Sequence, residues 1–374
     1  MIGGGVAGLT AGYLLADDGH SVTVLEAASR LGGQVHTELV DDFVVEHGAE
    51  GFPAASEPVG ELCRRLGLGS RVIEQQSRAT ALWDNGALSA LDPTRAADLI
   101  GIPTGGPPSR GLGSLRGGMA ELVAMLARAG LHPPLQHLAP GTRRIATLTD
   151  AAVRSIEYSA GRWVARTVRD DVFTADGLIL ATPPRVAAEL LRSIAPAVAG
   201  ALGRIALRSS LTASLAVRQE QIGTPLELSG VILRDRSDPA LVAATTCSSR
   251  FPGRAPPGWH LLRAFFRPEL ADFGIPDSEW VERALKGLTP VFRLRGSAGR
   301  AWVSRWPNAL PRPMSDADLA GLELPSSIAL AGAAMAGGIE GAVRSALGAV
   351  VRLDVGDPRP PLPIASAGLG LSPQ

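Results

Sequence analysis

The chain has 374 residues, 45% of them hydrophobic and 19% charged, which is the balance of a globular protein large enough for two domains. Its formal net charge is zero, so overall charge gives no reason to expect binding to nucleic acid or to an acidic membrane. The two cysteines, Cys63 and Cys247, exclude a disulfide framework, and we expect a reduced, cytoplasmic setting. The N-terminus lacks the pattern of a signal peptide, and the longest uncharged apolar stretch, residues 324–339, is too short to span a bilayer.

The N-terminal segment predicts a strand, a helix and a second strand. Ile2 is the stub of a strand, Val6 to Ala16 carries apolar residues at helical spacing, and Ser21 to Leu25 is a β-rich run. Only Met1 and Ile2 precede the first glycine, whereas strands usually have about five residues. We therefore expect either a start upstream of this sequence or a truncated strand that weakens the sheet centre and the retention of a cofactor.

Later segments alternate between helical and strand patterns. Helices are predicted from Pro58 to Leu66 and from Gly118 to Ala129, with a Gly- and Pro-rich connection over residues 101–118. Val153 to Val168 predicts a hairpin that turns at Ala160-Gly161. The other predicted elements are buried strands at 178–181 and 326–331, an antiparallel sheet within 211–266, a helix at 278–288, a small-residue helix that ends at residue 351, and a disordered Pro-rich tail at 357–374.

The turn between the first strand and the first helix has the spacing G-x-G-x-x-G, from Gly3 to Gly8. In such a turn the first glycine allows a tight bend, Gly5 lets the backbone approach a pyrophosphate, and Gly8 lets the helix pack on the strand. The helix start then offers N–H groups to the phosphates. Glu26 ends the second strand, where an acid accepts ribose hydroxyls and disfavours the 2′-phosphate of NADP. A plain glycine turn is the alternative, but this context favours a dinucleotide.

The segment from Glu26 to Gly33 has the pattern E-A-x-x-R-x-G-G. Arg30 could supply a second positive clamp for the pyrophosphate, and Gly32-Gly33 could pass close under a flavin. The alternatives are a solvated surface arginine and an ordinary turn. The fingerprint that precedes the segment favours the cofactor interpretation.

With these motifs the chain resembles the flavin amine oxidase superfamily and, within it, the protoporphyrinogen oxidases. The C-terminal segments 331–334 and 338–345 resemble the second flavin motif of the superfamily. Residues 251–256, 261–263 and 305–311, with the sequences F-P-G-R-A-P, L-L-R and R-W-P-N-A-L-P, are similar to protoporphyrinogen oxidases rather than to amine oxidases. Further matches to the family lie at residues 47–52, 85–88, 101–104, 115–119 and 175–183.

In the second flavin motif a strand ends, glycines bend the chain and a helix start faces the cofactor. The resemblance implies that backbone N–H groups near Ile339 bond the N1/O2 edge of the flavin and stabilise negative charge on the reduced ring. Ala333 replaces the acid that the superfamily has after this strand, so that contact must come from the backbone. A Gly/Ala-rich helix packed on the sheet is the alternative interpretation, and both can hold.

The resemblance implies an α/β fold: an FAD-binding Rossmann-type domain of the two-dinucleotide-binding-domain flavoproteins, with a second domain that contains an antiparallel sheet and a reduced helical part. FAD is expected to be non-covalent, because neither cysteine lies in the C-terminal motif. The expected FAD-binding parts are residues 1–84, 115–206 and 301–356, with a shortened substrate segment at 85–114, the sheet at 207–300 and the tail at 357–374. The residues expected to contact FAD are Gly3, Gly5, Val6, Ala7, Gly8, Glu26, Ala27, Arg30, Gly32, Gly33, Gln34, Val153, Ala181, Trp306, Gly332, Ala333, Gly338, Ile339 and Ala342.

Two departures from the family put the substrate in question. Residues 105–113 directly join two family segments between which protoporphyrinogen oxidases place a sizeable helical region, the source of much of their substrate-pocket wall. Many amine oxidases of the superfamily hold a lysine near flavin N5, but the only lysine here, Lys286, is expected on the surface of a helix. The expected function is an FAD-dependent oxidase of protoporphyrinogen oxidase type. The alternatives are an FAD-dependent amine oxidase or desaturase for another small molecule, and a degenerate FAD-binding protein without activity.

The implied chemistry is hydride transfer from a substrate C–H bond to flavin N5, followed by reoxidation by O2. The catalytic residues stay unknown; His36 is a weak candidate, because a lone histidine is more often structural. Trp306 is expected either against the flavin ring or in the core. Arg234 and Arg263 are candidates for substrate carboxylates, although surface exposure is favoured for both. The expected partners are a small-molecule substrate, with a porphyrinogen as the candidate, and O2; a homodimer is left open, and no nucleic acid or transmembrane segment is expected.

Overall fold

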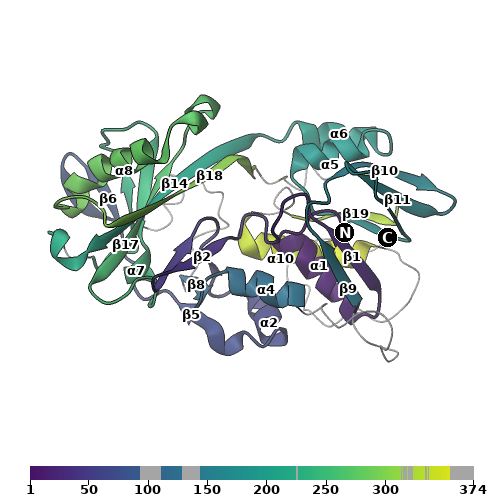
Figure 1. Ribbon diagram of the computed structural model, residues 1–374, viewed down its shortest axis with the longest axis horizontal. Helices are drawn as coiled ribbons and strands as arrows, with labels where there is room; N and C mark the ends of the chain where they lie inside the picture. The colour runs from purple at the N-terminus through teal and green to yellow at the C-terminus, as the bar shows by residue number, and fades with distance from the viewer. Residues whose placement is uncertain are drawn as a thin grey trace.

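The computed structural model describes residues 1–92, 111–128, 144–224, 226–312, 314, 318, 323–332, 335 and 337–353. Figure 1 shows two lobes. The N-terminal lobe contains α1 (Val6–Asp17) and a parallel sheet, and the sheet lobe contains a seven-stranded sheet and α8 (Asp277–Phe292). The expectations for residues 101–110, Ala129, Ala333 and 357–374 lie outside the described residues.

A parallel sheet with Ile2 at its centre organises the N-terminal lobe. β1 (Ser21–Leu25) pairs in parallel with β9 (Arg144–Leu148), and β13 (Leu178–Leu180) pairs in parallel with β19 (Ile328–Leu330). Ile2 bridges β1 on one side and β13 on the other. Its N–H donates to the Ile179 carbonyl at 2.9 Å, and its carbonyl accepts the Ala181 N–H at 2.7 Å. The short first strand expected from the sequence is therefore a stub that joins two strand pairs.

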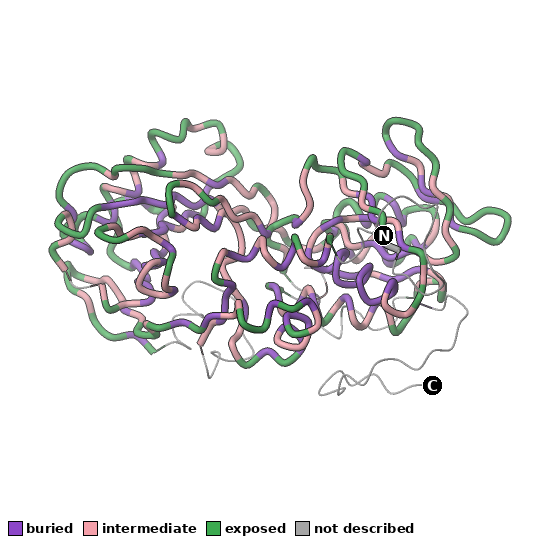
Figure 2. The backbone as a smooth tube through the Cα atoms, turned by 60° about the horizontal axis from the view of Figure 1, so that its bottom comes forward, coloured by how far each residue is buried: buried purple, intermediate pink, exposed green. Residues whose placement is uncertain are grey.

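Helices cover one face of this sheet. α1 and α10 (Gly338–Arg352) pack against each other, with α4 (Ala120–Arg128) and α2 (Glu57–Arg65) beside them. Residues 6–16 of α1 are buried throughout, because small and aliphatic side chains occupy all of its faces. Figure 2 shows buried backbone through the middle of both lobes and exposed backbone at the outer loops.

The other face of the parallel sheet carries α5 (Pro184–Leu191), α6 (Pro196–Gly203) and a three-stranded antiparallel sheet. The strands of this sheet are β10 (Val153–Ser159), β11 (Arg162–Thr167) and β12 (Val172–Ala175). The predicted hairpin is confirmed, and it turns at Ala160 and Gly161, both of which have positive φ.

The seven-stranded sheet confirms the predicted antiparallel sheet and extends it. Its strand order is β18-β14-β17-β16-β15-β6-β7, and the only parallel pair in it is β15 with β6. Apolar residues of α8, among them Trp280 and Leu288, pack on one face of the sheet. The strands are β6 (Thr80–Asp84), β7 (Ala87–Leu91), β14 (Leu207–Arg218), β15 (Gly230–Leu233), β16 (Leu241–Thr246), β17 (Trp259–Phe266) and β18 (Arg300–Pro311). The sheet thus includes residues 80–84 and 301–311, which the sequence assigned to the FAD-binding parts; the division into domains stays a proposal.

Two small sheets lie between the lobes (Figure 1). β2 (Thr37–Val40) pairs with β3 (Phe43–Glu46), and β8 (Leu112–Leu115) lies between β4 (Phe52–Pro53) and β5 (Val72–Glu74). The prediction of an irregular connection up to residue 118 was therefore wrong at residues 112–115. Residues 112–115 pair with β4 and β5, which are far away in the sequence, so no local pattern indicated this strand. The remaining short elements are η1 (Gly69–Arg71), η2 (Gln219–Gln221), α7 (Cys247–Arg250) and η3 (Leu270–Gly274).

No helix in the described part of the chain is both long and apolar enough to cross a membrane. The predicted helices at 6–16, 58–66 and 278–288 are confirmed with small shifts at their ends. The helix predicted from Gly118 begins at Ala120, because Gly118 has a positive φ of 92° that a helix does not accommodate.

The carboxyl group of Glu46, at the end of β3, holds the start of α4. It accepts the Met119 N–H at 2.7 Å and the Thr37 hydroxyl at 2.8 Å, and that hydroxyl accepts the Ala120 N–H at 2.9 Å. Only 5% of Glu46 is exposed. Burial raises the pKa of Glu46 to about 7, against the lowering effect of these hydrogen bonds and of Arg254.

We expect Glu46→Gln to stabilise the protein at alkaline pH. A carboxyl group whose pKa rises from 4.5 to about 7 on folding favours the folded state fully below pH 4.5, and this contribution is lost as the pH rises through 7. The loss is about 3 kcal/mol. The variant should therefore melt a few degrees above the unchanged protein at pH 8, and the difference should vanish near pH 5.

Thermal unfolding followed by circular dichroism between pH 5 and pH 8 measures this effect. Glu282→Gln, at an exposed position of α8, is the matched control and should show no pH-dependent difference. A Glu46→Gln difference that stays constant across this range would contradict the assignment.

Candidate cofactor and active site

The glycine-rich turn after Ile2 brings the backbone of two elements into direct contact. A Cβ atom at Gly3, where φ is +104°, would overlap the Ala181 carbonyl oxygen, and a Cβ atom at Gly8 would overlap the Gly3 carbonyl oxygen. At Gly5 the nearest neighbour of a Cβ atom would be Gly33 Cα at 3.9 Å. Gly3 and Gly8 are therefore needed for packing, whereas Gly5 leaves open space that a ligand can occupy.

Two helix starts follow turns that lie side by side at this end of the parallel sheet. Gly5 precedes α1 and Gly337 precedes α10, and neither helix has a side-chain cap. A Cβ atom at Gly332 would lie 4.0 Å from the Ala7 Cβ, so the turn after β19 lies beside the first turn of α1. The N–H groups and positive dipole ends of both helices are thus available to an anionic ligand.

The side chains at the two helix starts serve the core. Those of Val6, Ala7 and Ile339 are buried, and Ala342 is half-buried in the same core, so only their backbone can face a ligand. The turn after β19 is held by the Ser345 hydroxyl, which accepts the Gly332 N–H at 2.9 Å. Gly338 begins α10 with a positive φ of 72°.

The Glu26 carboxylate lies at the end of β1, against the glycine turn. It accepts the N–H groups of Gly4 at 2.6 Å and Ala28 at 2.8 Å, while Ala27, which follows Glu26, is exposed. The Ala151 N–H donates to the Glu26 carbonyl at 2.8 Å, which places the start of β10 nearby. Val153 itself packs into the hydrophobic cluster on the other face of the parallel sheet. The acid therefore lies where a ribose is expected.

Arg30 is not a solvated surface arginine. Its guanidinium donates to the carbonyls of Leu31 at 3.2 Å, Val35 at 3.1 Å and Gly33 at 2.8 Å, and burial lowers its pKa while Glu26 opposes that shift. The loop that it braces lies on the glycine turn, because the Gly32 N–H donates to the Gly4 carbonyl at 2.8 Å. A role of Arg30 toward pyrophosphate stays a prediction.

Residues of β18 reach this loop from the sheet lobe. The Gln34 amide donates to the Ala309 carbonyl, and Trp306 Nε1 donates to the His47 carbonyl at 2.7 Å. A Cβ atom at Gly48 would overlap the Gln34 carbonyl oxygen and lie 3.4 Å from the Trp306 ring. Trp306 thus lies where the two lobes meet, and its packing on a flavin ring stays a prediction.

His36 belongs to a cluster of polar groups at the same junction. Its ring stacks on that of His47 at 4.5 Å between centroids. His47 is bonded on both ring nitrogens, by Ser304 Oγ at 2.8 Å and by Glu38 Oε2 at 2.9 Å. Burial, followed by electrostatic interaction with Arg30 and His47, lowers the pKa of His36. Sequence reasoning missed His47, Glu38 and Ser304 as partners, because Ser304 comes 257 residues after His47 and no motif links them.

Three other residues that the sequence analysis singled out differ in how exposed they are. Arg263 is buried, which overturns the expectation of exposure; it donates to the carbonyls of Gly48 at 2.9 Å and His47 at 3.0 Å. Arg234 is exposed as expected and pairs with Asp84 at 2.9 Å. Lys286 is exposed on α8, also as expected.

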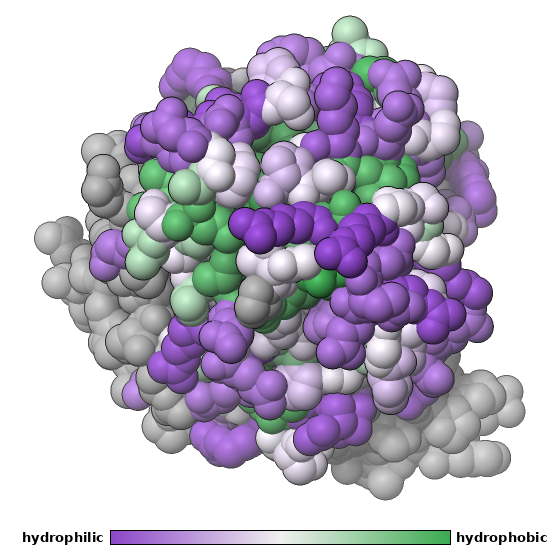
Figure 3. All heavy atoms as spheres, turned by 90° about the vertical axis from the view of Figure 1, so that its left-hand side faces the viewer, coloured by the Kyte–Doolittle hydropathy of each residue, from purple (hydrophilic) through white to green (hydrophobic). Residues whose placement is uncertain are grey.

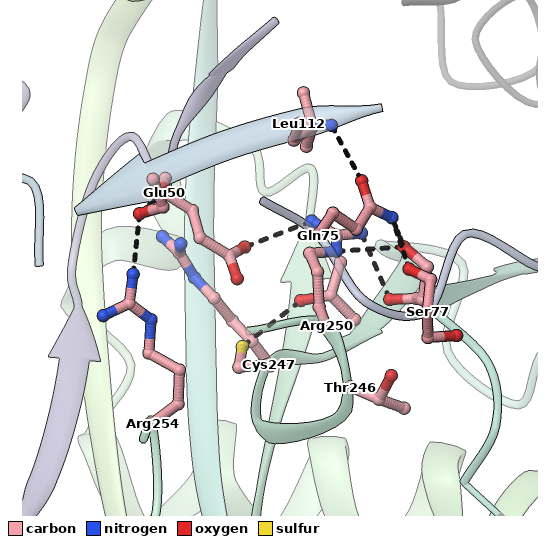
Figure 4. A network of polar contacts seen from close by, with 12 residues as sticks. Glu50, Gln75, Ser77, Leu112, Thr246, Cys247, Arg250 and Arg254 are labelled. Atoms are coloured by element: carbon pink, nitrogen blue, oxygen red, sulfur yellow. Dashed lines mark hydrogen bonds and ion pairs between the residues drawn. The ribbon is translucent and has the colours of Figure 1, made fainter. Parts of the chain in front are cut away.

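A buried polar network fastens the sheet lobe to the N-terminal lobe (Figure 4). Arg250 pairs with Glu50 at 3.3 Å and donates to both the hydroxyl and the carbonyl of Ser229. Arg254, only 1% exposed, donates to the Ser114 hydroxyl at 2.6 Å. Cys247 lies beside this network, and burial raises its pKa to about 12, so it stays a thiol. The arginine of the F-P-G-R-A-P segment therefore joins the lobes.

Glu50→Gln should destabilise the protein by about 3 kcal/mol, because it leaves the buried charge of Arg250 without its counter-ion. Urea unfolding measures the change in the free energy of unfolding. Glu157→Gln is the control: it breaks an exposed pair with Arg166 and should cost less than about 1 kcal/mol. If both variants lost the same free energy of unfolding, the pair of Arg250 and Glu50 would stabilise the protein no more than an exposed pair does.

Comparison with known proteins bears directly on this geometry. The family model of flavin containing amine oxidoreductases matches residues 6–108 and 109–354. The chain belongs to this family. Among curated relatives of this flavin containing amine oxidoreductase, the coproporphyrinogen III oxidase of Mycobacterium leprae is 27% identical, over 90% of this chain and 93% of the relative. The L-amino-acid oxidase of Mus musculus is 39% identical, but over only 21% of this chain and 13% of the relative.

Solved structures of this family share the fold. A candidate protoporphyrinogen oxidase from Exiguobacterium sp. 255-15 superposes with a TM-score of 0.75 at 20% identity, covering 94% of this chain and 97% of the other. Cyclohexylamine oxidase from Brevibacterium oxydans superposes with a TM-score of 0.70 at 16% identity, covering 94% and 97%. The match to the Mycobacterium leprae relative extends over 429 residues, more than the 374 of this chain, so that relative carries residues that this chain lacks.

FAD is the cofactor of this flavin containing amine oxidoreductase. The cradle fits FAD, because open space over Gly5 meets two uncapped helix starts with an acid beside them. Neither cysteine lies in the C-terminal flavin segment, and both are buried. The assignment of individual residues to parts of FAD stays a prediction.

We expect Gly5→Ala to weaken FAD binding at least tenfold while leaving the protein folded. The φ and ψ angles of Gly5, −74° and 179°, suit any residue, so the new methyl group enters only the open space. Fluorescence titration of the deflavinated protein with FAD measures the affinity. Gly60→Ala, in α2 with no atom within 4 Å of its Cβ position, is the control. Unchanged affinity in Gly5→Ala would place the pyrophosphate elsewhere.

Proposed function

We propose that this protein is an FAD-dependent oxidase of the protoporphyrinogen oxidase type, which dehydrogenates a porphyrinogen and passes the electrons to O2. The observation that carries this proposal is the match to a coproporphyrinogen III oxidase along nearly the whole of both chains. The L-amino-acid oxidase matches cover 21% of the chain or less. Matches that short carry no argument about a shared substrate.

The amine oxidase alternative receives less support. Putrescine and cyclohexylamine oxidases have the same fold, but at 15% and 16% identity the likeness shows the fold alone. The only lysine of the sequence, Lys286, is exposed on α8, which packs on the sheet face opposite to the one that carries Ser304 and Trp306. No lysine is therefore placed for contact with a flavin in the described region. Retention of the whole glycine cradle argues against a degenerate protein.

FAD, when bound, accepts the hydride of the substrate at flavin N5. The helix start of α10 would stabilise negative charge near the reduced ring through the backbone N–H groups around Ile339. Burial and neighbouring positive charge lower the pKa of His36, which favours the neutral imidazole, and a neutral imidazole has one nitrogen that can take up a proton. His47 orients it by stacking, with its own ring fixed by Ser304 and Glu38. His36 is thus the residue proposed to receive the substrate proton.

Anaerobic titration of the purified flavoprotein tests the proposal. Coproporphyrinogen III or protoporphyrinogen IX should bleach the flavin absorbance, and readmitted O2 should restore it with formation of hydrogen peroxide. Putrescine and cyclohexylamine, added in the same way, should leave the spectrum unchanged.

Bleaching by an amine and by neither porphyrinogen would overturn the substrate assignment. A protein without flavin absorbance even after addition of FAD would overturn every enzymatic interpretation. Failure of O2 to reoxidise the bleached flavin would overturn only the choice of acceptor.

A further inference from the structure

Strand β18 leaves the ladder of the seven-stranded sheet within the R-W-P-N-A-L-P segment, where the two lobes meet. Its register with β14 shifts between Trp306 and Leu310, so residues 307–309 lie opposite the single residue Ser209. This arrangement is a β-bulge. Bulges bend a strand and are frequent next to active sites, where they change the direction of a group.

The backbone of the bulge makes its polar contacts outside the ladder of β14 and β18. Pro307 has no N–H group, and the Asn308 N–H donates to the Ser209 hydroxyl at 3.1 Å. The Ala309 carbonyl accepts the side-chain amide of Gln34. Because the ladder is interrupted here, the bulge brings a backbone acceptor of the sheet lobe to a residue of the N-terminal lobe.

Asn308 suits the backbone conformation of the bulge. Its φ is +49°, in the left-handed region that glycine and asparagine adopt most readily and in which β-branched residues are outliers. The sequence has one other asparagine, Asn85, whose φ is +51° in the turn between β6 and β7. Both asparagines of the chain therefore occupy left-handed positions.

Gln34 belongs to the loop that lines the open space over Gly5. The preceding residue, Gly33, supplies the nearest atom to an added Gly5 Cβ, at 3.9 Å. The Gln34 carbonyl accepts the Ala49 N–H at 3.1 Å, and its side chain is bound by Ala309. Loss of the Ala309 contact would thus release the side chain of a residue next to the cofactor space.

We propose that the bulge at Pro307 and Asn308 positions this loop for FAD, and that Asn308 is a positioning residue that acts through Ala309 and Gln34. Asn308 contributes through its backbone conformation rather than by touching the cofactor. A loop with a released Gln34 has more conformations to lose when FAD binds, so the affinity falls. This role goes beyond the proposed function, because it concerns FAD alone and holds for any substrate.

Fluorescence titration of the deflavinated protein with FAD tests this role. Asn308→Val, in which the left-handed φ is strongly disfavoured, should bind FAD about tenfold more weakly than the unchanged protein. Asn308→Gly, which adopts this φ freely, should bind FAD within about twofold of it. At saturating FAD, the visible circular dichroism of the bound flavin should change in the valine variant and stay the same in the glycine variant.

Asn85→Val is the matched control, because it places the same residue at the same kind of φ. Asn85 lies in the hairpin at the edge of the seven-stranded sheet opposite to β18. Figure 3 faces the outer end of this lobe, where hydrophilic and apolar side chains share the surface. Asn85→Val should lower the melting temperature of the deflavinated protein as Asn308→Val does, but its affinity for FAD should be unchanged.

Gln34→Ala tests the contact through which Asn308 is proposed to act. It should weaken FAD binding by itself, and addition of Asn308→Val should weaken it little further, because both changes remove the same contact. If Asn308→Val does not fold, Asn308→Ala takes its place in every comparison, since alanine also disfavours this φ.

Four results would overturn the role of the bulge: unchanged FAD affinity in Asn308→Val, an equal loss in Asn308→Gly, an equal loss in Asn85→Val, or losses that multiply in the double variant. Anaerobic reduction of the flavin by a porphyrinogen judges the proposed function separately. That measurement depends on the substrate, whereas the titrations depend only on FAD.

Discussion

Contact between the Gly3 carbonyl and Gly8 sets how closely α1 approaches the centre of the parallel sheet. A side chain at Gly8 would push the helix away from Ile2, which joins two strand pairs through its own backbone, and a side chain at Gly3 would clash with the Ala181 carbonyl. Because the helix lies so close, its first turn opens beside Gly33 and beside the turn at Gly332. Three segments far apart in the sequence therefore meet at one point. The cofactor cradle is the space that remains there.

The sheet lobe builds on this arrangement from the other side. Arg263 fixes the His47 and Gly48 carbonyls to β17, and Trp306 fixes the His47 carbonyl to β18. The sheet face that carries Ser304 and Trp306 therefore meets the loop at His47, on the boundary between the two lobes. The polar cluster around His36 lies on the same boundary and is made from both lobes.

Sequence patterns predicted the helices, strands and turns that are determined by neighbouring residues. Helix α1, strand β1 and the hairpin at Ala160-Gly161 each carry their own periodicity or turn residues. The short strand β8 was missed, because residues 112–115 become a strand only through partners at Phe52 and Val72. The C-terminal flavin segments were predicted from the resemblance to a family. The spacing of residues alone would have indicated only the glycine-rich turn at the N-terminus.

Only some residues of the candidate site could be predicted from the sequence. The glycines and Glu26 follow from a motif, whereas the pairing of His47 with Ser304 depends on how two lobes dock. Arg263 was expected at the surface because arginines usually are; hydrogen bonds to the backbone carbonyls of His47 and Gly48 instead hold it inside.

The buried network of Arg250 and Arg254 also bears on how the molecule moves. A hinge that opened the lobes like a clam would separate Arg250 from Glu50 and Arg254 from Ser114, and would expose charges that now have partners. Hydrogen bonds to charged groups contribute about 1.5–3 kcal/mol each, so the junction resists such an opening. These contacts therefore hold the two lobes together at this junction.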